Sequence, residues 1–145
     1  MLERANGMKF EIKHRSSGEL LFSIETDTWR LAVEAAIKQK ANLRYANLSC
    51  ADLSSANLRS ADLRSADLSY ANLNSADLSY ANLLIFQYQR HQAVCAGERL
   101  IIGRHDKSLA EWACDFEKIG KEAGYTELQI QMYGKFIEMC IEAQR

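Results

Sequence analysis

The side chains best suited to binding a metal ion are histidines and cysteines that follow residue 90. A structural zinc ion prefers nitrogen and sulfur ligands, and four side chains could supply them: His91, Cys95, His105 and Cys114. Their spacing matches no common zinc motif, and the chain contains no Cys-x-x-Cys pair. We therefore expect no metal and no other cofactor. The four cysteines, which include Cys50 and Cys140, are expected to be reduced and to pack as small apolar residues.

Acid–base catalysis is the second kind of chemistry that this part of the sequence could support. The candidate groups are His91, His105, Asp106 and Glu111. No nucleophile elbow, phosphate-binding loop or metal signature surrounds them. The pair His105-Asp106 precedes a predicted helix, and such a position is more typical of a turn than of an active site. A small enzyme built on this segment is therefore the alternative hypothesis, and we expect the protein to be non-catalytic.

Charge and hydropathy disfavour nucleic-acid and membrane binding. The 145 residues carry 18 basic and 19 acidic side chains, so no strong field attracts a polyanion. Arg99, Arg104 and Lys107 are interleaved with acidic residues, which argues against a nucleic-acid groove in the C-terminal segment. No apolar run approaches the roughly 20 residues of a membrane span, and the first residues lack the apolar core of a signal peptide. We expect a cytoplasmic protein.

A strictly periodic segment occupies the middle of the chain, before the residues considered above. Alanine recurs every five residues from Ala41 to Ala81, and leucine does so from Leu43 to Leu83. These positions define nine units of the form Ala-(Asn/Asp)-Leu-x-x over residues 41–85. Five is the period of neither a helix nor a strand, whereas self-similarity at a fixed short period predicts a solenoid.

The segment before the repeat, residues 1–40, predicts a hairpin and a helix. Apolar residues alternate with polar ones on both sides of the turn signal Arg15–Gly18, which is typical of a β-hairpin. Thr26 or Thr28 is the expected N-cap of the helix that follows.

The segment after the repeat, residues 86–145, predicts a second hairpin and two more helices. Val94 and the run Leu100–Ile102 flank a short turn. Capping boxes, Ser108 with Glu111 and Thr126 with Gln129, begin the two helices. Gly124 is expected to end the first of them.

The nine units resemble those of the pentapeptide-repeat family. This resemblance implies a β-solenoid, a right-handed quadrilateral β-helix with four units in each coil and with the Leu and Ala side chains pointing inward. Nine units correspond to about two coils. Because such a short stack has two open ends, we expect residues 1–40 and 86–145 to form α+β caps at both ends.

Four units per coil would place residues 20 apart on top of one another, so the outer surface becomes predictable. Asn47 then stacks on Asp67, and Asp52 stacks on Asn72. No carboxylate stacks on another, so we interpret the Asn/Asp alternation as control of register. The outward side chains that could form a partner surface are Arg44, Arg59, Arg64, Tyr70 and Tyr80. The alternative is a solvated cluster of arginines around Asp62.

The resemblance also implies a range of functions. The best-known role in the family is mimicry of B-form DNA that engages DNA gyrase. That role fits poorly, because residues 41–85 are few and carry three basic and four acidic side chains. The layout looks more like that of small bacterial or phage-borne members. We therefore predict a protein-binding or adaptor protein that acts on a host complex, for example in counter-defence.

The last predicted helix, about Glu127–Ala143, carries more apolar residues than one buried face needs. One stripe, from Ile130 to Ile141, can pack on the preceding helix. The second stripe consists of Leu128, Met132, Phe136 and Met139. This second stripe can either cover the coil end near residues 83–86 or meet a second copy of itself. We predict a homodimer built largely by this segment.

Overall fold

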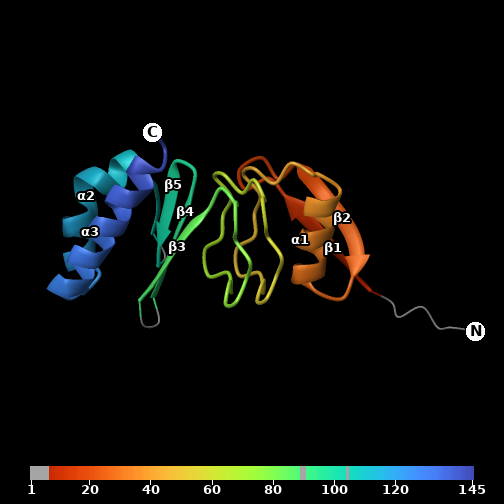
Figure 1. Cartoon of the computed structure of the whole chain (residues 1–145), viewed down its shortest axis with the longest axis horizontal. Helices are drawn as coiled ribbons and strands as arrows, with labels where there is room; N and C mark the ends of the chain where they lie inside the picture. Colours follow the sequence, from red (N-terminus) through yellow and green to blue (C-terminus); the bar gives the residue numbers. More distant parts are fainter. Residues whose placement is uncertain (1–6, 89–90, 104) are drawn as a thin grey trace, which may run out of the picture. The chain divides into compact units, whose positions relative to one another are not determined.

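The computed structural model describes residues 7–88, 91–103 and 105–145, and these residues divide into two compact units. The first unit is Met1–Asn82 and the second is Leu83–Arg145. Within the described residues the chain forms six strands and three helices (Figure 1). These are β1 (Met8–Lys13), β2 (Leu20–Thr26), α1 (Trp29–Lys38), β3 (Leu84–Tyr88), β4 (His91–Ala96), β5 (Arg99–Ile102), β6 (His105–Ser108), α2 (Leu109–Glu122) and α3 (Glu127–Glu142). No helix in the described parts of the chain combines the length and the apolar character that a membrane crossing requires.

The predicted N-terminal hairpin and helix are both present in the first unit. Strands β1 and β2 pair antiparallel, with Ile12 opposite Phe22, and Ile12 is fully buried. The helix N-cap is Thr28, whose side chain accepts the backbone N–H of Leu31, because Thr26 is still paired within the hairpin. Buried residues of α1 recur at helical spacing: Ala32, Val33 and Ala36.

The hairpin and α1 form hydrogen bonds with residues in the first four units of the repeat. The backbone N–H of Asn47 donates to the carbonyl of Lys13 at 2.7 Å. On another side of the repeat, the backbone N–H of Asn57 donates to Oε1 of Glu34 at 2.8 Å. Backbone groups that would otherwise be left open at this end of the repeat are therefore satisfied by the preceding segment.

A sharp turn ends the five-residue units of the repeat. The fifth residue of each unit from Tyr45 to Tyr80 has a φ between 57° and 60°. The N–H of the next alanine donates to the leucine carbonyl three residues earlier, as Ala46 does to Leu43 at 3.1 Å. A positive φ at the third residue and this hydrogen bond are features of a type II turn. The five-residue period is thus the period of a turn, which explains why it matches neither helix nor strand.

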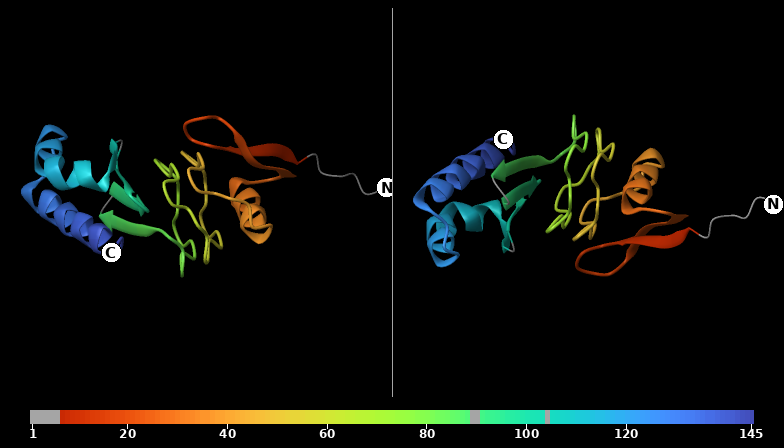
Figure 2. Two further views of the ribbon diagram at one scale, coloured as in Figure 1. Left: turned by 90° about the horizontal axis from the view of Figure 1, so that it is seen from above. Right: turned by 90° about the horizontal axis from the view of Figure 1, so that it is seen from below.

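Backbone bonds between the turns join residues that are 20 positions apart in the sequence, and we call each such stretch of 20 residues a row. Parallel bridges pair Asn47 with Asp67, Asp52 with Asn72, and Asn57 with Asp77. Figure 2 shows the two rows of the repeat lying side by side. Each bridge is isolated, so the described structure has no strand between α1 and β3, and its two sheets are small and antiparallel. The predicted stacking of residues 20 apart is confirmed for these three pairs.

The leucines of the repeat form the core of the first unit. Leu63 and Leu68 are completely or almost completely buried, as predicted. Leu78 is less protected and is only half-buried, whereas Leu73 before it and Leu83 after it are buried. The predicted ninth unit ends early, because strand β3 begins at Leu84.

The second unit contains a larger sheet than the sequence predicted. Strands β3, β4, β5 and β6 form an antiparallel sheet in that order. The predicted hairpin is its central pair, with Val94 opposite Ile101. Strand β3 was hidden because it begins inside the periodic segment. Strand β6 has the sequence His-Asp-Lys-Ser, which shows no apolar alternation.

Helices α2 and α3 contribute to a core shared with this sheet. Their buried residues include Trp112, Tyr133 and Ile137, which cluster with Cys95 and Leu100 of the strands. Both capping boxes are present, and Gly124, with a φ of +76°, directly follows Ala123, the C-cap of α2. The helical spacing of the apolar residues predicts that Ala113 lies on the buried face of α2 together with Trp112, but Ala113 is exposed.

Candidate functional site

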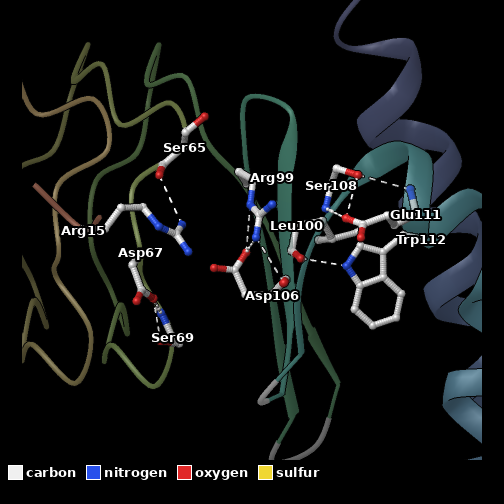
Figure 3. Close-up of polar contacts among 10 residues, drawn as sticks. All are labelled: Arg15, Ser65, Asp67, Ser69, Arg99, Leu100, Asp106, Ser108, Glu111 and Trp112. Atoms are coloured by element: carbon white, nitrogen blue, oxygen red, sulfur yellow. Dashed lines mark hydrogen bonds and ion pairs between the residues drawn. The ribbon is translucent and has the colours of Figure 1, made fainter. Parts of the chain in front are cut away.

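The Asn and Asp side chains of the repeat hold its turns. Oδ1 of Asp67, for example, accepts the backbone N–H of Ser69 at 3.0 Å and its hydroxyl as well (Figure 3). In eight units, from Asn42 to Asp77, Oδ1 of the Asn or Asp side chain accepts the backbone N–H of the residue two positions later. These are Asx turns, a role that the sequence analysis missed although Asn and Asp favour it.

The predicted role in stacking is also observed at one position. Nδ2 of Asn72 donates to Oδ1 of Asp52 at 3.2 Å across one row. Hydrogen bonds from Ser54, together with this one, hold the pKa of the Asp52 carboxyl below its usual value. The Asn or Asp side chain at the second position of each unit therefore stabilises the repeat itself. The side chains at the fourth and fifth positions of each unit are the ones left to contact a partner.

Two of the predicted partner residues, Arg44 and Arg64, lie side by side on adjacent rows. The backbone N–H of Tyr45 donates to the carbonyl of Arg64 at 3.1 Å, which fixes the rows next to each other. Arg64 pairs with Asp62 through Nε at 2.8 Å and through Nη2. The guanidinium of Arg44 lies 6.0 Å from the ring centre of Tyr45.

Arg59 and Tyr80 form a second contact, at the turn that precedes residues 61–65. The guanidinium of Arg59 lies 5.1 Å from the centre of the Tyr80 ring, and Tyr80 is 79% exposed. A backbone bond from Ser60 to the carbonyl of Ser79, 2.9 Å long, joins the two rows here. Because an exposed cation–π contact orders two side chains without burying them, this pair presents both a charge and an aromatic face to solvent.

The unit Ala61–Ser65 runs between these two contacts. Arg59 and Tyr80 lie at the turn before it, and Arg44 and Arg64 lie at the turn that ends it. We call the five exposed side chains at these turns the Arg–Tyr surface: Arg44, Tyr45, Arg59, Arg64 and Tyr80.

Tyr45 is a member of this surface that the sequence analysis missed. Its ring stacks on His14, with ring centroids 5.3 Å apart. His14 belongs to the segment after β1, so no local pattern in the repeat pointed to the contact. Nearby, Arg15 donates to the carbonyl of Ser65 at 3.2 Å (Figure 3). Tyr70, by contrast, lies at the turn that ends residues 66–70 and is not part of this surface, although it is exposed.

The candidate acid–base groups of the second unit serve its own structure. Asp106 accepts two hydrogen bonds from the Arg99 guanidinium, at 3.1 and 2.8 Å (Figure 3). Glu111 closes the capping box of α2, and hydrogen bonds from Ser108 hold its pKa below the usual value. His105 packs edge-on against Trp112. The side chain of His91 lies outside the described residues.

The cysteines divide into two kinds. Cys95 and Cys140 are buried in the core of the second unit, where the hydrogen bond between their thiols lowers the pKa of Cys95. Cys50 and Cys114 are exposed, so our expectation that all four pack as apolar residues is wrong for these two. Cys114 is exposed because its position on α2 faces away from the sheet. Among the described side chains, no three His, Cys, Asp or Glu residues gather as a metal site.

The predicted interface stripe on α3 needs one correction. Phe136 is only 4% exposed, because its ring stacks on Phe86 of β3 with centroids 5.5 Å apart. Leu128 and Met139 are exposed, and Met132 is half-buried. The exposed stripe of α3 is therefore made by Leu128, Met132 and Met139, without Phe136.

Comparison with known proteins identifies the repeat and nothing beyond it. A family model described as pentapeptide repeats matches eight copies, over residues 39–69 and 56–84. The matched stretches lie in the periodic segment and its immediate flank. No curated protein and no solved structure matched the chain.

Proposed function

The chain is a pentapeptide-repeat protein, and from that premise we propose that it is a non-catalytic protein that binds another protein through the Arg–Tyr surface. The observation that carries this proposal is the contact between Arg59 and the highly exposed Tyr80. Arginine and tyrosine are enriched among the residues that dominate binding at protein interfaces. Side chains already ordered before binding lose less conformational entropy when a partner arrives.

We also infer that residues 41–83 wind as a right-handed quadrilateral β-helix of about two coils. Support comes from the turn at each fifth residue and from bridges between residues 20 apart, since four five-residue sides make one such coil. This architecture would display the Arg–Tyr surface on a rigid scaffold. A rigid scaffold favours a binding role, because it holds the side chains of the turn residues at constant distances from one another.

Affinity capture tests the binding function. The full-length protein is immobilised and exposed to an extract of its native host, and bound proteins are scored for stoichiometry. We expect a stoichiometric partner that is lost when Arg59→Ala and Tyr80→Ala are combined. Tyr70→Ala is the matched control, because this tyrosine is also exposed but lies outside the surface. Equal capture by both variants would reject the Arg–Tyr surface as the binding site.

The narrower hypothesis is a phage-borne protein that acts on a host complex, and the identity of the captured partner tests it. The free thiols of Cys95 and Cys140 are compatible with a reducing compartment such as the cytoplasm. Gyrase mimicry and a nucleic-acid role are weaker alternatives, because the repeat interleaves arginines with carboxylates instead of forming a surface of one sign. A small enzyme is also weaker, since Asp106 and Glu111 already have structural partners.

We retain the homodimer as a proposal. Leu128 and Met139 are more than half exposed on α3 and lie on one side of it with half-buried Met132. An apolar stripe of this kind on a small chain is a candidate interface. A two-fold dimer would bring the same stripe from each copy into contact.

A further inference from the structure

Two guanidinium groups on the Arg–Tyr surface lie beside a single carboxylate. Arg64 is paired with Asp62 within its own repeat unit. In the neighbouring row, the residue equivalent to Asp62 is Asn42, a neutral side chain whose Oδ1 accepts the backbone N–H of Arg44 at 3.1 Å. The hydrogen bond from Arg64, assisted by the charge of Arg44, holds the pKa of the Asp62 carboxyl below its usual value. One carboxylate therefore faces two positive charges.

We propose that Arg44, with Tyr45 and Tyr80 on either side of the unit 61–65, receives an acidic segment of the partner protein. This inference rests on the proposed binding function and adds the chemistry of the partner. The guanidinium of Arg44 is exposed, and it has no ion-pair partner among the residues that the structure describes. A planar guanidinium can bind a carboxylate through two parallel hydrogen bonds. The partner's carboxylate would form with Arg44 the kind of ion pair that Asp62 forms with Arg64.

The same surface favours a protein segment over a nucleic acid. Asp62 lies beside Arg64, and the charge of Arg59 acts on Asp77, so two carboxylates accompany three arginines. Duplex DNA carries about one negative charge per 1.7 Å of its axis, and several phosphates would meet these carboxylates at once. A peptide can present one carboxylate to Arg44 while its other side chains contact Tyr45 and Tyr80.

A titration followed by amide NMR tests the inference on the full-length protein. The probe is a decapeptide of alternating Glu and Gly, compared with a Lys-Gly decapeptide and with a short DNA duplex. We expect the acidic peptide alone to shift amides of residues 42–45, 59–65 and 80. Arg44→Gln should weaken this binding about fivefold, the loss expected for one charge contact. Lys121→Gln, which makes the same charge change on an exposed residue of α2, should leave it unchanged.

Three results would overturn the inference: no binding of the acidic peptide, binding that Arg44→Gln does not weaken, or tighter binding of the DNA. The amide spectrum of each variant also reports whether its fold is intact, so unfolding cannot pass for lost binding. Failure here is distinguishable from failure of the proposed function. If capture still depends on Arg59 and Tyr80 while the acidic peptide does not bind, the binding function stands and the partner is not acidic at this surface.

Discussion

At the scale of single residues, the hydroxyl of Tyr133 is buried and has no hydrogen-bond partner among the residues that the structure describes. Replacing it in Tyr133→Phe removes an unsatisfied polar group and keeps the ring in the core. We expect the free energy of unfolding to rise by about 1 kcal/mol, measured by urea denaturation. Tyr70→Phe is the control, because its hydroxyl is in solvent and its loss should change nothing. A less stable Tyr133→Phe would mean that the hydroxyl has a partner.

The same tyrosine predicts a loss of stability at alkaline pH. Burial raises the pKa of Tyr133 from 10.0 to about 12. Between these values the unfolded chain releases the proton while the folded chain keeps it, so the free energy of unfolding falls as pH rises. The contribution is fully present below pH 10 and lost as pH approaches 12. Tyr133→Phe should lack this loss, and parallel stability curves for the two proteins between pH 10 and pH 12 would contradict the assignment.

The Asn/Asp stack makes a second prediction for single residues. Asn72→Asp replaces the amide that donates to Asp52 by a carboxylate, so two negative charges face each other across one row. We expect a modest destabilisation, measured by urea denaturation, that shrinks at high salt, because both groups are exposed and their repulsion is screened. Asn74→Asp places the same charge outside the stack as a control. Equal effects of both substitutions would show that the stack does not control register.

At the scale of the elements, the repeat depends on its leucine column and on its turns together. Leu63 has a relative exposure of 0%, so Leu63→Ala leaves a cavity that the tightly turned backbone cannot easily fill. We expect this substitution to lower the free energy of unfolding by about 2–5 kcal/mol, measured by denaturant titration. Leu78→Ala, at a half-buried position of the same column, should cost clearly less. Similar costs at both positions would contradict the difference in burial between Leu63 and Leu78.

At the scale of the whole molecule, the exposed stripe of α3 makes the quaternary structure testable. We expect light scattering to give the mass of a dimer, because Leu128 and Met139 remain 56% and 60% exposed in the single chain. The double variant Leu128→Glu, Met139→Glu should be a folded monomer, since neither side chain belongs to the core. Gln131→Glu, also on α3, should remain dimeric. A monomeric wild-type protein, or a dimeric double variant, would reject this interface.

Local and periodic features of the structure could be read from the sequence. The repeat places Leu63 inside and pairs Asn47 with Asp67, because each unit repeats the same turn and so transmits its geometry to the next. The capping boxes at Ser108 and Thr126 were equally predictable, since the cap and its partner lie three residues apart. Interactions that close within a few residues, or recur at a constant spacing, need no knowledge of the remaining chain.

The tertiary structure alone decided which of two apolar stripes α3 buries and which residues join the Arg–Tyr surface. Phe136 belongs to the core because Phe86, fifty residues earlier, lies where its ring can stack. Tyr45 is positioned by His14 of the N-terminal segment. Strand β6 forms because Leu100 and Ile101 provide it with a partner, although its own residues are polar. For Phe136 and Tyr45 the outcome depends on a neighbour distant in sequence, whose position no local spacing or composition contains.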